Sequence, residues 1–192
     1  MKRFTEYIRE ALDTVHPHKQ VSNEVDDFDI VRDLEDRPIG VSGRTIRHAF
    51  EDPHSGHTVH VTHRIDHDID DYDPKKLAQS IKNPKATRIS VSFSRSPGEG
   101  STEHTYARVK GGKGTLGIFS TVGHITKNMI QKHGKGETTV NMDASNSRVP
   151  SYVRMGERLS GGVAPEVTPY SDRHRMYGHS KISIKVPKGK NQ

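Results

Sequence analysis

The 192-residue chain contains no cysteine. This absence excludes disulfide bonds, a thiolate nucleophile and any zinc site built on cysteine ligands. The chain also lacks an apolar run approaching the ~20 residues that a membrane-spanning helix needs. Its charged opening, Met1–Tyr7, lacks the apolar region of a secretion signal. We therefore expect a soluble protein of the cytoplasm with no membrane partner.

Apolar and aromatic residues are scarce. Only 30% of the residues are hydrophobic and 6% are aromatic, whereas there are 17 glycines and 10 prolines. Such a composition predicts a small core and a large share of loop or surface. One domain is the default at this length.

Charge is unevenly distributed along the chain. There are 30 Lys and Arg residues against 24 Asp and Glu residues, a net charge of +6 with neutral histidine. Asp26 to Asp73 is acidic, and the chain is basic from Lys75 onward. A basic half suits nucleic acid or a phosphate-bearing cofactor, although a solvated basic face has the same composition. No aromatic residues interleave with the basic ones as in single-strand binding.

The N-terminal third gives weak signals for secondary structure. Residues 3–12 predict a short amphipathic helix, 29–34 a short strand and 44–50 a helical turn. We expect residues 1–55 to be an irregular N-terminal extension, followed by a core over 56–187 and a basic tail over 188–192.

The core alternates predicted strands and helices, which makes it an α+β domain. Strands are expected at residues 57–65, 89–93, 104–109, 138–142 and 181–186, with 89–93 and 104–109 paired as a hairpin. Helical spacing predicts helices over 75–81, 116–130 and 149–159. Residues 145–147 are expected to cap the last helix, and 160–162 to end it. Residues 165–178 are expected to form a loop that can include short strand pairing.

A glycine-rich turn comes between the strand at 104–109 and the helix that follows it. A strand entering such a turn at a helix N-terminus presents backbone N–H groups to an anion, and the helix dipole adds partial positive charge. Gly111, Gly112 and Gly114 would form the turn, with Lys110 and Lys113 adding charge. A pyrophosphate would suit this site, whereas the simpler interpretation is a tight turn.

The order of elements from Ile89 to Leu159 resembles the heart of the GNAT family of N-acetyltransferases. In that family a strand ends in an Arg/Gln-x-x-Gly-x-Gly/Ala loop that binds the pyrophosphate of acetyl-CoA. Val109–Gly114 matches it, with Gly112 and Gly114 at the glycine positions and Val109 in place of Arg or Gln. The resemblance implies a GNAT-like mixed, mainly antiparallel sheet flanked by helices, with acetyl-CoA as cofactor.

The resemblance also implies roles for residues after the next strand. Asn146 matches an asparagine of the family's cofactor-binding region. Tyr152, followed four residues later by Gly156, matches the tyrosine that protonates the departing CoA thiolate. The ordinary alternative for Tyr152 is packing of the helix on the sheet. Three residues are candidates for the general base, and the sequence does not rank them: Glu103, His104 and Asp143.

Histidines and carboxylates do not predict a metal site. His57 and His63 share one strand face while His60 lies on the other, so the three cannot converge. The acidic run from Asp66 to Asp73 lacks the glycine and terminal glutamate of an EF-hand loop. No metal is therefore expected.

Three functions remain open. Residues 118–122, 147–152 and the opening Met1–Tyr7 also resemble GNAT-like proteins of tailed bacteriophages, where such domains occur as virion components. Val109 and the lack of a clear base favour a catalytically degenerate structural or assembly protein, bound to other virion subunits, in a virion or a bacterial host's cytoplasm. The first alternative is an acetyl-CoA-dependent N-acetyltransferase attacked directly by an acceptor amine. The second is a basic nucleic-acid-binding accessory protein.

Overall fold

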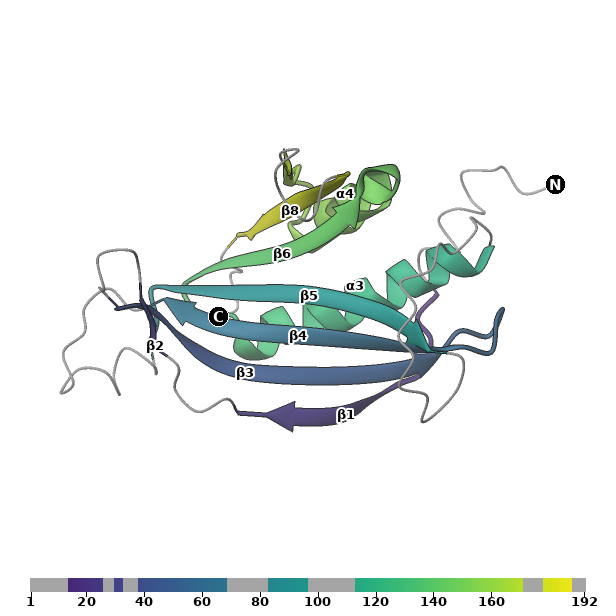
Figure 1. Cartoon of the computed structure of the whole chain (residues 1–192), viewed down its shortest axis with the longest axis horizontal. Helices are drawn as coiled ribbons and strands as arrows, with labels where there is room; N and C mark the ends of the chain where they lie inside the picture. Colours follow the sequence, from purple (N-terminus) through teal and green to yellow (C-terminus); the bar gives the residue numbers. More distant parts are fainter. Residues whose placement is uncertain are drawn as a thin grey trace.

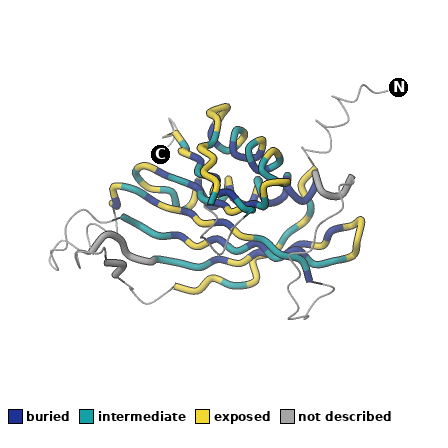
Figure 2. The backbone as a smooth tube through the Cα atoms, turned by 45° about the horizontal axis from the view of Figure 1, so that its top comes forward, coloured by how far each residue is buried: buried dark blue, intermediate teal, exposed yellow. Residues whose placement is uncertain are grey.

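The computed structural model describes residues 14–25, 30–32, 38–68, 83–96, 113–170 and 178–187. These residues form a mixed, mostly antiparallel sheet with two helices packed against it. The predicted α+β class is therefore confirmed. Both helices lie on the same side of the sheet (Figure 2), and the other face of the sheet carries no helix of the described part of the chain.

The sheet follows the order β1-β3-β4-β5-β6-β8-β7, and β2 pairs with β3 beside this path. Every neighbouring pair is antiparallel except β5 and β6, which are parallel. The bounds are β1 His18–Glu24, β2 Ile30–Arg32, β3 Pro38–Glu51, β4 Thr58–Asp68, β5 Ala86–Ser96, β6 Glu137–Ser145, β7 Glu166–Pro169 and β8 His179–Val186.

The two helices flank β6 in the sequence. Helix α3, Lys113–His133, lies between β5 and β6 in the chain, as a parallel pair of strands requires a long crossover. A short 3-10 turn, η1 Asn146–Arg148, leads from β6 into α4, Val149–Leu159. The chain leaves α4 through Gly161 and Gly162, whose φ angles of 75° and 105° suit only glycine without strain.

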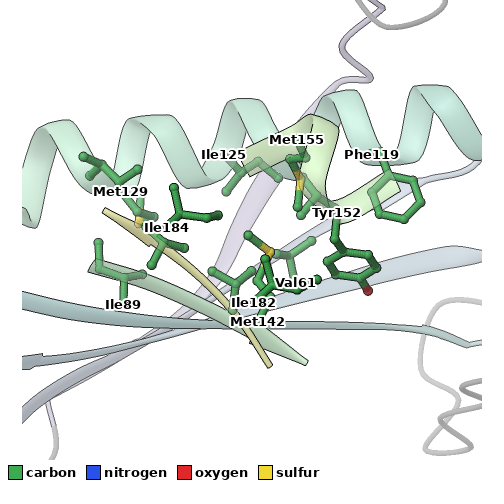
Figure 3. Packing of buried hydrophobic residues seen from close by; sticks show 14 of the residues in the cluster. Val61, Ile89, Phe119, Ile125, Met129, Met142, Tyr152, Met155, Ile182 and Ile184 are labelled. Carbon is green, nitrogen blue, oxygen red and sulfur yellow. The ribbon is translucent and has the colours of Figure 1, made fainter. Parts of the chain in front are cut away.

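The core lies between the helices and one face of the sheet. Alternate residues of β4, β5, β6 and β8 point into it, and α3 buries the side that carries Ile118, Val122 and Ile125. Figure 3 shows this packing, with Ile89, Met142 and Ile184 of the strands facing Met129 and Met155 of the helices. Side chains spaced by two in strands and by three or four in helices thus build one apolar layer.

The helical turn predicted at 44–50 is wrong, because these residues form part of β3. Ile46, His48 and Phe50 are buried on one face, so the spacing is two. Because the polar residue His48 occupies a core position between Ile46 and Phe50, the apolar alternation of this strand was not recognised in the sequence. The expected irregular extension is also incorrect where it is described, since β1 and β3 are strands of the sheet. Gly56, with φ of 66°, belongs to the β3–β4 turn.

Most other predicted elements agree with the structure. The strands at 57–65, 89–93, 138–142 and 181–186 correspond to β4, β5, β6 and β8, and the helices at 116–130 and 149–159 to α3 and α4. The loop at 165–178 contains β7. The predicted cap at 145–147 is wrong, because neither η1 nor α4 has a side-chain capping bond. The helices at 3–12 and 75–81, the strand at 104–109 and the tail lie outside the described residues.

Candidate functional site

The parallel pair β5 and β6 separates into a fork. Their ladder runs from Ala86 opposite Glu137 to Val91 opposite Met142 and stops there. Both strands continue, β5 to Ser96 alongside β4, and β6 to Ser145 alongside β8. Figure 1 shows β6 diverging from β5 beyond this point. In the described part of the chain, no strand pairs with the two edges that face each other across the fork.

A cavity of about 610 Å³ occupies the fork. Val91, Ala144 and Tyr152 line it from the side of the helices, whereas Ser92 and Asp143 belong to the opposite, exposed face. The cavity therefore passes from one face of the sheet to the other. Its remaining lining residues are Phe93, Ser145, Ser147, Arg148 and His179.

Tyr152 stands on the helix side of this cavity. It is 7% exposed. Its ring stacks on Phe93 at 5.8 Å between centroids and meets Phe119 edge-on at 5.1 Å. Figure 3 shows its hydroxyl directed away from α3. Burial raises the pKa of Tyr152 to about 12, so the phenol keeps its proton at neutral pH and can donate it.

Gly156 brings the helix that carries Tyr152 close to the sheet. A Cβ atom built at this position would lie 2.5 Å from Pro165 and 3.0 Å from Ile184 of β8. Only glycine allows this close approach of α4 to β8. The glycine four residues after Tyr152 therefore has a packing role that sets the depth of the tyrosine.

Asp143 stands on the exposed side of the cavity. The hydroxyl of Tyr170 donates a hydrogen bond to its Oδ1 at 2.5 Å. This bond and partial burial raise the pKa of Tyr170 to about 12. Lys181 of β8 lies directly opposite Asp143 in the ladder. Two residues further along the same ladder, His179 pairs with Ser145, and the buried Nδ1 of His179 has no hydrogen-bond partner among the described atoms.

The structure brings together Tyr152 and Asp143, two of the residues predicted from the sequence. Asn146 is in η1 and does not line the cavity, because its side chain accepts a hydrogen bond from Ser180 at 2.9 Å. It joins η1 to β8. Lys113 and Gly114 are the first residues of α3. The other predicted site residues lie outside the described part: Glu103, His104, Lys110, Gly111 and Gly112.

Sequence reasoning missed His179, Ser92 and Arg148 as cavity residues. His179 falls at the end of a predicted loop, and only the β6–β8 register places it beside Ser145. The alternation of β5 predicted that Ser92 faces solvent. It did not predict that β6 stops pairing with β5 next to this residue. No local sequence signal encodes either fact, because both depend on which strands pair.

Neither a metal site nor a membrane span is found in the described residues. They contain no group of three His, Asp or Glu side chains that could hold a metal ion. None of their helices is long and apolar enough to cross a membrane. No protein-family model, curated protein or solved structure gives a significant match to this chain.

Proposed function

We propose that this chain is a GNAT-like domain that binds an acyl-CoA in the fork and transfers the acyl group to an amine. The observation that carries the proposal is the cavity that passes through the sheet between β5 and β6 with Tyr152 at its wall. The mixed, mostly antiparallel sheet, with β5 and β6 as its parallel pair, agrees with the sheet that the resemblance implies.

The fork suits a narrow ligand that carries amide groups. Beyond Val91 and Met142 the edges of β5 and β6 no longer pair with each other. An extended amide chain can bond to such edges as an added strand does. The arm of coenzyme A is of this kind. The cavity volume lies within the ~300–1,000 Å³ typical of small-molecule sites.

The start of α3 supports a site for the phosphates. The first turn of α3 contains no acidic residue, whereas Lys132 and His133 lie in its last turn. This distribution favours an anion at the N-terminus. Lys113 and Gly114 begin the helix, so the predicted pyrophosphate turn at Gly111–Gly114 would lead directly into it.

Asp143 and Tyr152, the proposed proton acceptor and donor, line the cavity from opposite faces of the sheet. An acyl-CoA, when bound, would supply a thioester carbonyl carbon. An acceptor amine forms the new C–N bond to that carbon, and the C–S bond breaks. The amine gives up a proton to the Asp143 carboxylate, and Tyr152 gives its hydroxyl proton to the leaving sulfur. Asp143 is the only one of the three predicted bases that lies in the described part of the chain.

Calorimetry with acetyl-CoA tests the proposal. We expect wild-type protein to bind it, Ser92→Trp to abolish binding because the indole fills the fork, and Ser90→Trp to bind as wild type does. Ser90 is the matched control, since it is exposed on the same strand and face but still inside the ladder, opposite Asn141. Wild-type protein that binds no acetyl-CoA refutes the proposal.

An assembly role in a virion is the second candidate. Both edge strands carry exposed valines: Val21 on β1 is 47% exposed and Val167 on β7 is 37% exposed. An exposed edge strand presents main-chain N–H and C=O groups that can pair with a strand of another subunit. Concentration-dependent sedimentation that Val21→Lys or Val167→Lys reduces would support this role. The nucleic-acid alternative stays a prediction, which a steep salt dependence of DNA affinity would support.

A further inference from the structure

The face of the sheet opposite α3 and α4 has a hollow beside the fork. Its volume is about 590 Å³. It shares Val91, Ser92 and Asp143 with the fork cavity, so the two spaces adjoin. A molecule in the hollow can therefore reach the fork from the face opposite to the helices.

Most of the residues that line the hollow have polar or charged side chains. Hydroxyl and amide side chains cover its floor, including Ser90, Thr62 and Asn141. Val91 is its one aliphatic residue. Side chains of this kind offer many hydrogen bonds, which suits a small polar acceptor.

Two of the three basic side chains in the hollow are already paired. Arg64 Nε lies 3.2 Å from Asp66 Oδ1, and Arg88 Nη2 lies 2.6 Å from Asp68 Oδ1. Lys181 makes no ion pair within the described part of the chain. Its neighbour across the ladder is Asp143, so a negative and a positive side chain stand side by side at the mouth of the fork.

We infer that the acceptor is a small amine that carries a carboxylate next to the amino group, with its carboxylate on Lys181 and its amine at Asp143. This inference rests on the proposed acyl transfer. Asp143 lines both spaces and so holds the amine where it can enter the fork. Because Arg64 and Arg88 are paired with carboxylates, Lys181 is the positive charge beside Asp143 that favours a carboxylate and disfavours a second ammonium group at that point.

The test compares amino acids with their carboxamides as acceptors. Thiol release from acetyl-CoA gives kcat/KM for alanine, alaninamide and spermidine with wild-type protein, Lys181→Ala and Lys185→Ala. Lys185 is the matched control, since it is exposed on the same strand and face but lines neither space. Comparing one acceptor between two variants cancels the different basicities of the amines.

We expect Lys181→Ala to lower kcat/KM for alanine about tenfold and to leave alaninamide unchanged, because one charge-assisted bond is lost only with the carboxylate. Lys185→Ala should change neither value. Equal effects of Lys181→Ala on the two acceptors, or a preference for spermidine, overturn the inference. Acetyl-CoA binding without reaction of any carboxylate-bearing amine overturns it and leaves the proposed function intact. Absence of acetyl-CoA binding overturns both.

Discussion

The stability of this protein should fall steeply in mild acid because of His63. This side chain of β4 is fully buried, and its Nε2 lies 3.0 Å from the hydroxyl of Thr126 on α3. The Thr126 hydroxyl donates its own proton to the carbonyl of Val122, so Nε2 of His63 must be the donor in this bond. Nδ1 is then the unprotonated nitrogen, and it is buried with no partner among the described atoms.

Protonation of this nitrogen is strongly opposed in the folded state. Burial, together with smaller contributions from the charges of His48 and His133, lowers the pKa of His63 to about 3. The unfolded chain, with an ordinary pKa of 6.5, takes up the proton first as the pH falls. The contribution to stability is therefore complete above pH 6.5 and is lost progressively toward pH 3. Between pH 7 and pH 4.5 the loss from this one residue is about 2 to 3 kcal/mol.

Urea denaturation at the two pH values measures this loss. His63→Gln keeps a donor toward Thr126 but cannot titrate. Between pH 7 and pH 4.5 its free energy of unfolding should therefore fall by about 2 to 3 kcal/mol less than that of the wild type. His54→Gln, at an exposed turn position, should keep the wild-type dependence. If wild type and His63→Gln lose the same free energy between these pH values, the reasoning is refuted.

Two further predictions concern the fork and the ion pair between Arg95 and Asp52. Tyr152→Phe should lower kcat for thiol release by about a hundredfold while leaving acetyl-CoA affinity unchanged, since only the proton donor is removed; an unchanged kcat contradicts the role. Arg95→Ala should destabilise the protein by about 2 to 4 kcal/mol in urea denaturation, because the Asp52 carboxylate, 2.6 Å from Arg95 and 1% exposed, loses its partner. Arg47→Ala, which breaks an exposed pair with Glu24, should change it by less than about 1 kcal/mol, and equal effects of the two would disprove the argument.

Much of the core could be predicted because it follows local periodicity. The strict alternation of β4 and the helical spacing in α3 and α4 appear directly in the sequence, and each agrees with its burial pattern. β3 was missed because histidine and arginine stand among its apolar residues. His48 is buried there in contact with His63, a pairing of two histidine rings at 6.0 Å that periodicity does not encode.

The candidate site could be predicted only in part. Tyr152 and Asp143 were identified from motif spacing and residue type, and both line the fork cavity. Asn146 was assigned to the cofactor, whereas its hydrogen bond with Ser180 holds η1 on β8.

The sequence by itself determined the α+β class, the helices and the alternating strands, because neighbouring residues set backbone preference and the spacing of apolar side chains. Only the tertiary structure decided that β5 and β6 run parallel and separate after Val91 and Met142. Where β5 and β6 separate depends on the pairing of β5 with β4 and of β6 with β8. It depends also on how α4 packs against β8 through Gly156. The fork, and the meeting of Tyr152 with Asp143 across it, follow from these distant contacts.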